Sequence, residues 1–333
     1  MRLSLLTAVL GLSLALPTAQ AALFSEPPWQ ALLDAGRADE MERQALTRLR
    51  EKPGDLQASA ALALAQIDLA DHKRQEQGLR SMQDCVDNKP DEALCPYVLA
   101  SLMTVQASNG GALKALSLAG RIKSNFLRAL SLKPDMIEAR SALQQYYLIV
   151  PAIAGGGAAK ARELEAEVRS SQPDYARLMR ARAAATEKNW ALMEKELRSI
   201  SPSADEGLRA ELRLAWGLLA KELIDQKQYP RARALLEQLQ KDQPNHALAA
   251  YGLGRMYTAM EQFDEAIRQF ERARALDGAE QLPLDHRIGV ALQAKGEKAL
   301  ARAAFERYLQ NRRASPNNVE DCRRRLAELG PAL

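Results

Sequence analysis

The sequence has few of the residues on which catalytic and metal sites depend. Only three histidines occur in 333 residues, at His72, His246 and His286, and none is at ligand spacing from a cysteine or another histidine. A nucleophilic site would need Ser or Cys beside a histidine and an orienting acid, and the sequence shows no such set. Its many carboxylates alternate with lysines and arginines, as on exposed helix faces. We therefore expect no catalytic residues, no metal and no cofactor, although folding could still bring two carboxylates together.

Aromatic residues, alternating β-type runs and an excess of one charge are also scarce. Phe, Trp and Tyr make up 5% of the chain, whereas Ala, Leu, Arg, Glu and Gln dominate. Because few segments alternate between apolar and polar residues, we expect no β-sheet. The formal net charge of +4 is spread over 46 basic and 42 acidic side chains. No basic stripe of the kind that binds nucleic acid is evident, so we expect an all-α protein with no nucleic-acid partner.

Only one long apolar run occurs, from Leu3 to Leu16. It follows Arg2, ends at Pro17, and precedes Ala19–Ala21, which supplies the small residues that a signal peptidase needs. The run is shorter than the ~20 residues that cross a bilayer as a helix. We expect residues 1–21 to be a signal peptide cleaved after Ala21, giving a periplasmic or secreted protein without an integral membrane span. An uncleaved N-terminal anchor is the alternative.

Export would allow disulfides to form among the three cysteines. Cys85 is near the end of one expected helix and Cys95 near the start of the next, and antiparallel neighbours can bring two Cα atoms within disulfide distance. We expect a Cys85–Cys95 disulfide; separate packing of two small apolar residues is the alternative. Cys322 is then left over, either free or available for an intermolecular link, which leaves a homodimer open.

The stretch from Ala249 to Gly278 has the pattern of two short helices joined by a turn. Small and aromatic residues recur on one face of each helix: Leu253, Gly254 and Tyr257 on the first, and Ala266, Phe270 and Ala273 on the second. This order, L-G-x-x-Y followed by A-x-x-x-F, resembles the tetratricopeptide repeat (TPR), a helix–turn–helix unit of about 34 residues. It returns on both sides, with Ala232 34 residues before Ala266 and Phe305 35 residues after Phe270. The resemblance implies a right-handed α-solenoid of TPR-like repeats.

The pattern divides the chain after the signal peptide into three parts. Residues 202–313 are expected to form regular TPR repeats, after a candidate hinge at Ser201–Glu206, and residues 314–333 a C-terminal capping helix. Residues 22–201 are expected to form degenerate TPR-like repeats with insertions, because the prolines that punctuate them are irregularly spaced. In that part Ala112–Leu132 is expected to be one long helix with these side chains facing inward: Leu113, Leu116, Ile122, Phe126 and Leu130.

The resemblance also implies a concave groove lined by the first helix of each repeat. Aromatic and long polar side chains on the free side of those helices suit a peptide or a partner helix. The candidates are Tyr97, Gln145, Lys221, Tyr251, Arg255 and His286. We expect a non-catalytic scaffold or adaptor that binds a protein or peptide of the cell envelope. A structural solenoid that associates with itself is an alternative.

The most individual segment follows Tyr146 and contains Pro151, Ile153, Gly155, Gly156 and Gly157. Its P-x-I-A-G-G order is similar to a segment of uncharacterised exported bacterial TPR proteins, a resemblance that implies no activity. Three glycines before a helix could form a nest of amides that binds an anion, with help from Lys160. The spacing is not that of a P-loop, and no strand is expected before it. The other interpretation is a tight inter-helix loop in which glycines permit unusual backbone angles.

Overall fold

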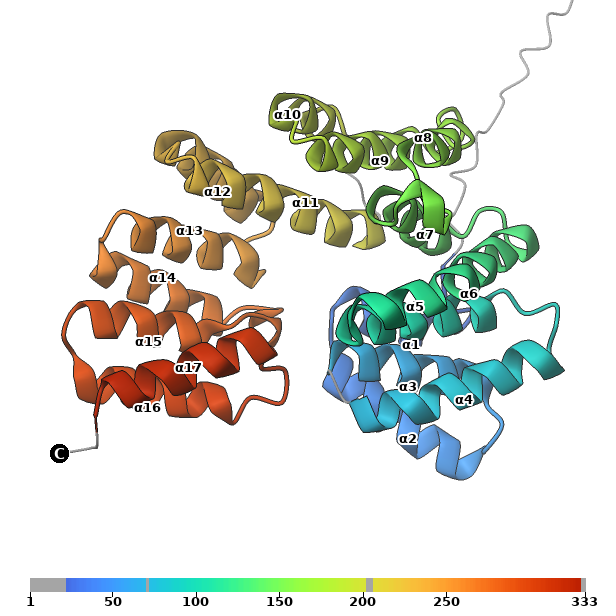
Figure 1. Cartoon of the computed structure of the whole chain (residues 1–333), viewed down its shortest axis with the longest axis horizontal. Helices are drawn as coiled ribbons and strands as arrows, with labels where there is room; N and C mark the ends of the chain where they lie inside the picture. The colour runs from blue at the N-terminus through green and yellow to red at the C-terminus, as the bar shows by residue number, and fades with distance from the viewer. Residues whose placement is uncertain (1–21, 70–71, 202–205, 331–333) are drawn as a thin grey trace, which may run out of the picture.

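The computed structural model describes residues 22–69, 72–201 and 206–330, and their regular structure is helical (Figure 1). Along these residues there are seventeen α-helices and two short 3-10 helices, and no β-strand. One isolated bridge pairs His246 with Asp277. The predicted signal peptide and residues 202–205 of the predicted hinge lie outside the described residues.

The helices follow one another with short connections. The first part of the chain contains α1 (Pro27–Asp34), α2 (Ala38–Glu51), α3 (Leu56–Asp68), α4 (His72–Asn88), α5 (Leu94–Asn109), α6 (Gly111–Leu132), α7 (Ile137–Ile149), η1 (Ala152–Ala154) and α8 (Ala158–Ala166). The second part contains α9 (Pro173–Thr186), α10 (Trp190–Arg198), α11 (Glu206–Asp225), α12 (Tyr229–Asp242), α13 (Ala247–Ala259), α14 (Phe263–Arg274), η2 (Ala279–Gln281), α15 (Leu284–Ala294), α16 (Lys298–Leu309) and α17 (Pro316–Glu328). Asp55 caps α3 by accepting a hydrogen bond from the Ala58 amide at 3.0 Å.

Glycine allows the two helices of a repeat to approach closely. A methyl group added at Gly254 of α13 would lie 2.5 Å from Cε1 of Phe270 in α14, and one added at Gly289 of α15 would lie 2.5 Å from Cε1 of Phe305 in α16. Both phenylalanines are fully buried. The glycine and phenylalanine of the repeat pattern are therefore a packing pair, repeated with the same geometry in two consecutive repeats.

The helices form two layers. Odd-numbered helices from α3 to α15 form the inner layer: α3 contacts α5, α7 contacts α9, and α11 contacts α9 and α13. Even-numbered helices pack outside their partners, as α6 packs on α5 and α14 on α13. The array curves, so that α13–α17 lie opposite α2–α6 in Figure 1. This is the layering of an α-solenoid.

The two ends of the curved array meet. Helix α1 contacts both α3 and α11. In the turn after α16, Arg313 Nη2 lies 3.0 Å from a carboxylate oxygen of Asp39 and 3.3 Å from one of Asp68, and Arg312 Nη1 lies 3.3 Å from Asp39. We call these four side chains the arginine clasp. It joins the C-terminal repeats to α2 and α3 across the opening of the curve.

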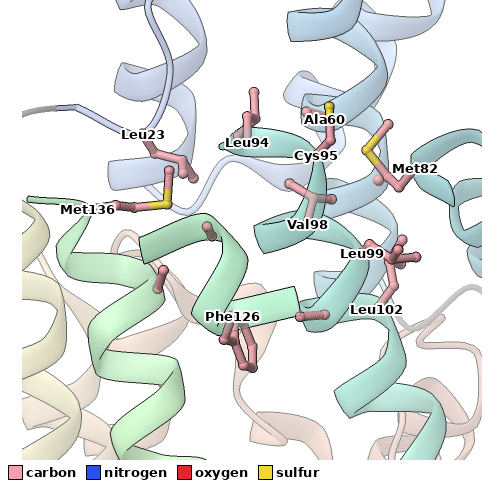
Figure 2. Packing of buried hydrophobic residues seen from close by; sticks show 14 of the residues in the cluster. Leu23, Ala60, Met82, Leu94, Cys95, Val98, Leu99, Leu102, Phe126 and Met136 are labelled. Atoms are coloured by element: carbon pink, nitrogen blue, oxygen red, sulfur yellow. The ribbon is translucent and has the colours of Figure 1, made fainter. Parts of the chain in front are cut away.

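The core begins with the first described residues. Leu23 and Phe24 are buried in a cluster that extends to Met179, and Figure 2 shows Leu23 and Met136 within it. Lys133 Nζ donates to the Ala22 carbonyl at 2.8 Å. Two further clusters, between residues 137 and 256 and between 247 and 322, continue the core to the C-terminal helices. The segment before α1 is therefore part of the folded body.

Two side chains of α6 do not point where the sequence predicted. Ile122, Phe126 and Leu130 are buried, but Leu113 and Leu116 are exposed, so the prediction that they face inward is wrong. At 3.6 residues per turn, Leu113 lies on the side of α6 opposite Ile122, and Leu116 lies about a third of a turn away. The neighbours of α6 cover only the stripe that contains Ile122.

The C-terminal helix and the disulfide have the expected places. Helix α17 packs on α16, and its Cys322 is fully buried. A disulfide joins Cys85 at the end of α4 to Cys95 at the start of α5, with Cα atoms 5.8 Å apart. In the described part of the chain, no helix combines the length and apolar character that a membrane span needs. The predicted domain boundaries remain predictions.

Candidate functional site

An apolar groove opens between α5 and α7, with α6 as its floor. Its volume is about 590 Å³. The floor is made of small residues followed by larger ones along one stripe of α6: Ala112, Ala115, Ala119, Ile122 and Phe126. The alanines leave the space that larger side chains would fill. Ser, Thr, Gln and Tyr are the polar residue types of the lining, which contains no charged side chain.

The α5 wall is polar by composition but offers few free donors. The hydroxyls of Ser101, Thr104 and Ser108 each donate to the carbonyl four residues earlier, at 2.8–3.0 Å. These hydroxyls have donated their hydrogen atoms within α5 and are not available as donors to a ligand in the groove. Gln145 of α7 is an exposed amide in the opposite wall. The groove therefore favours apolar side chains and offers a polar amide at its mouth.

The groove is flanked by exposed apolar side chains. Ile153 is 99% exposed, Leu113 86%, Ile149 76% and Leu116 63%. Ile149 itself lines the groove, Leu116 is in the second turn of α6, and η1, which carries Ile153, contacts α6. Leu113 lies on the side of α6 opposite Ile122 and is not part of this group. We call Leu116, Ile149 and Ile153 the apolar rim. Exposed apolar residues gathered in this way mark interaction sites more often than isolated ones do.

The glycine loop after α7 is tightly folded and presents Ile153. The amides of Gly155, Gly156 and Gly157 donate to the carbonyls of Ala152, Pro151 and Tyr147 at 3.0, 3.2 and 2.8 Å. Gly155 and Gly157 have positive φ angles of 90° and 120°. A methyl group at Gly156 would lie 1.7 Å from the Val150 carbonyl oxygen. Because all three amides already bond to protein carbonyls, the geometry favours the tight-loop interpretation over an anion nest.

Two lysines lie beside this loop. Lys160 Nζ donates to the Gly155 carbonyl at 3.1 Å and lies 5.9 Å from the centre of the Tyr147 ring. Lys123 Nζ of α6 is 3.0 Å from the position that a Cβ atom would take at Gly155. The ammonium groups of Lys123 on α6 and Lys160 on α8 thus both lie next to Gly155, in the loop that carries Ile153. Sequence reasoning considered Lys160 but missed Lys123 and the apolar rim.

The six predicted groove residues do not form one cluster. Each lies on an inner-layer helix: Tyr97 on α5, Gln145 on α7, Lys221 on α11, Tyr251 and Arg255 on α13, and His286 on α15. Among them only Gln145 lines the groove over α6. Tyr97 is half-buried, with its ring 6.2 Å from that of Phe126, and burial raises the pKa of its hydroxyl.

The other predicted residues are mostly engaged within the repeats. Lys221 is exposed and pairs with Asp225 at 2.5 Å. Tyr251 is half-buried, with its ring 5.9 Å from the Phe270 ring. Arg255 is half-buried as well. These contacts are those of ordinary repeat packing and give no sign of a shared ligand site.

His286 is not on a free surface, so that part of the prediction is wrong. Its side chain is buried because α17 covers this end of the solenoid, and Nε2 lies 2.7 Å from Oδ2 of Asp321. The ring also lies 5.6 Å from that of Tyr308. Burial lowers the pKa of His286 despite the carboxylate. Burial alone would raise the pKa of Asp321, but hydrogen bonds from Arg325, His286 and Arg324 hold it well below its usual range.

The fold does not favour Cys322 as a link between molecules. Its side chain, on the face of α17 that packs into the C-terminal core, is fully buried, and burial raises the pKa of the thiol to about 11. A thiol must be deprotonated and accessible to exchange. In the described residues no cluster of three or more His, Cys, Asp or Glu is placed to hold a metal ion.

Comparison with known families agrees with the repeat pattern in the regular part. Residues 223–282 match the family model described as tetratricopeptide repeat. This segment includes the Gly254–Phe270 packing pair, so the TPR resemblance stated for the regular repeats is supported. No curated protein matches the chain. The resemblance of the P-x-I-A-G-G segment remains a prediction.

Solved structures resemble the chain over most of its length. Yeast Tom70 gives a TM-score of 0.61 at 13% identity, covering 89% of this chain and 59% of that chain. The Cut9–Hcn1 hetero-tetramer of the APC/C gives 0.47 at 14% identity, covering 91% and 55%. A TPR protein from Parabacteroides merdae gives 0.44 at 14% identity, covering 92% and 97%. This chain thus spans little more than half the length of the Cut9–Hcn1 and Tom70 chains. The likeness to Tom70 confirms the predicted all-α solenoid fold and nothing beyond the fold.

Proposed function

We propose that this protein is a non-catalytic scaffold of the cell envelope that binds a segment of a partner protein in the groove over α6. The observation that supports the proposal is the apolar groove between α5 and α7 together with its apolar rim. A solenoid exposes inner-layer helices to partners, and here the groove leaves Ala112 and Ala115 of α6 accessible beside buried Ala119, Ile122 and Phe126.

The same geometry argues against the self-associating alternative. The ends of the solenoid are closed on each other by the arginine clasp, so they are not open for head-to-tail stacking. Cys322 is buried and does not favour a disulfide-linked dimer. A second copy of the chain could instead bind through the apolar rim, and the experiment below distinguishes this case.

The test is site-specific photo-crosslinking in the envelope of the native cell. A photoreactive residue replaces Gln145, which is exposed in the groove, or Leu300, which is exposed on α16. We expect a discrete adduct with another protein from position 145 and none from position 300. The same adducts from both positions would refute the groove as the binding site. Adducts of the chain with itself from position 145 would replace the proposal with self-association.

Export belongs to the same proposal. It is supported by the apolar N-terminal run and by the disulfide between Cys85 and Cys95, since disulfides persist mainly outside the cytosol. Leu23 and Phe24 are buried in the core, so cleavage beyond Ala22 would remove core residues. We expect N-terminal sequencing of the protein from a periplasmic extract to begin at Ala22. Full-length protein in the cytosolic fraction alone would refute export.

A further inference from the structure

Basic side chains are concentrated in the segment that builds the groove. No Asp or Glu occurs from Ala93 to Pro134. Residues 93–162 contain two acidic residues, Asp135 and Glu138, and eight basic ones: Lys114, Arg121, Lys123, Arg128, Lys133, Arg140, Lys160 and Arg162. Eight minus two gives +6 for this segment, whereas the whole chain has +4. The rest of the chain therefore has a slight negative excess, and this segment, which supplies most of the groove lining, is a basic part of the sequence.

Most of the arginines in this segment already have partners in the protein. Arg121 donates to Gln83 at 3.0 Å, Arg128 to the Pro90 carbonyl at 3.0 Å, and Arg140 to Glu167 at 2.5 Å. The lysines differ. Within the described residues, no carboxylate lies within 4.0 Å of the ammonium group of Lys123 or Lys160. Two ammonium groups that form no ion pair within the described residues thus lie beside the loop that carries Ile153.

We propose that the segment bound in the groove is acidic and amphipathic. Resting on the proposed function, this inference names the partner's chemistry: its apolar side chains occupy the space above Ala115 and Ala119, and its carboxylates pair with Lys123 and Lys160 beside Ile153. Complementary charge fixes the register of such a segment and selects against basic ones. The groove lining itself has no charge, so the apolar contacts supply affinity and the lysines supply selectivity.

The test uses two labelled synthetic peptides and fluorescence anisotropy. Both have about 16 residues, roughly four helical turns, with leucines along one face; one has glutamates beside this face and its twin has lysines there. We expect the acidic peptide to bind the wild-type protein at least about tenfold more tightly than its twin. The preference should fall as salt is raised, because exposed charges are screened.

Three variants locate the interaction. Lys123→Glu with Lys160→Glu should weaken binding of the acidic peptide about tenfold or more and strengthen that of the basic twin. Ile153→Ser should weaken both peptides about tenfold, because a wholly exposed side chain can lose contacts only with the ligand. The control, Lys241→Glu with Lys298→Glu, makes the same change in net charge at exposed positions on α12 and α16.

The outcomes separate this inference from the proposed function. If both peptides bind equally and Ile153→Ser weakens both, the groove binds apolar segments but the acidic partner is refuted. If neither the lysine pair nor Ile153 affects binding, both proposals fail at this site. Vesicles of phosphatidylcholine and phosphatidylglycerol serve as a further probe. If they bind through Lys123 and Lys160 while the acidic peptide does not, a membrane surface replaces the peptide and the inference is wrong.

Discussion

The close approach of Gly254 to Phe270 gives a prediction whose size follows from the structure. In Gly254→Ala the new methyl carbon would lie 2.5, 2.6 and 2.9 Å from three ring atoms of Phe270, all far inside van der Waals contact. The ring is fully buried and cannot swing into solvent. Overpacking of this kind costs about 1–3 kcal/mol. Alanine in place of glycine inside a helix stabilises the protein by about 1 kcal/mol. The free energy of unfolding should therefore change by between zero and a decrease of roughly 2 kcal/mol.

A matched variant isolates the overlap from helix propensity. Gly120 is inside α6, and a methyl group there would have no heavy atom within 4 Å. Gly120→Ala should therefore stabilise the protein by about 1 kcal/mol. Since both substitutions gain the same propensity, their free energies of unfolding should differ by about 1–3 kcal/mol, the cost of moving the ring. Urea denaturation followed by circular dichroism measures both.

Two further variants test the cause. Gly289→Ala reproduces the same contact with Phe305 one repeat later and should change stability in the same direction as Gly254→Ala. Adding Phe270→Leu to Gly254→Ala should recover part of the loss, because contacting residues are coupled. If Gly254→Ala stabilises the protein as much as Gly120→Ala, the close packing of α13 on α14 is wrong.

Three other predictions concern the disulfide, the capping helix and the clasp. Cys85→Ser should lower the free energy of unfolding by about 2–3 kcal/mol, and the difference from wild type should vanish when both are denatured in dithiothreitol. Asp321→Asn should lower the melting temperature at pH 5, since the carboxylate accepts bonds from His286 and two arginines. The pKa of Asp321 is lower in the folded state, so the stabilisation by its carboxylate is present above the unfolded pKa of about 3.9 and is lost as the pH falls. The difference in melting temperature between wild type and variant should therefore be smaller at pH 2.5 than at pH 5. A constant difference would contradict the assignment. Arg313→Ala should open the curve and raise the radius of gyration in small-angle X-ray scattering. Arg268 forms an exposed ion pair within α14, and the control Arg268→Ala should leave the radius of gyration unchanged. Equal scattering from wild type and both variants would show that the clasp does not hold the ends together.

The features that sequence predicted well are those set by contacts within one repeat. Gly254 and Phe270 are 16 residues apart and meet because one turn separates their helices. Such a pair recurs at the repeat period, so its pattern is visible in the sequence. Helix α6 and the adjacency of Cys85 and Cys95 are local in the same sense. These elements could be predicted because the residues that form them are close together in the sequence.

The features that sequence missed depend on which neighbour covers which face. Leu113 and Leu116 are apolar residues of a helix that is apolar on several sides, and only the position of α5 and α7 decides which stripe is buried. His286 is covered by Asp321, which lies 35 residues away on a helix outside the repeats. The clasp joins Arg312 to Asp39 across 273 residues. Gln145 was predicted for the groove and lines it, and the acid-free stretch of residues 93–134 marks the basic segment that supplies much of the lining.

The position of α1 explains why binding is proposed over α6 and not along the regular repeats. Helix α1 contacts α11, and its C-terminal residues Asp34 and Ala35 face the α12–α13 turn across a cavity of about 620 Å³. A segment that followed the inner face of α11 would therefore meet the protein's own N-terminal helix. No residue of α1 lines the groove between α5 and α7. The chain thus covers part of the concave surface that a TPR array usually offers, and leaves open the groove over α6, beside which the apolar rim, Lys123 and Lys160 are found.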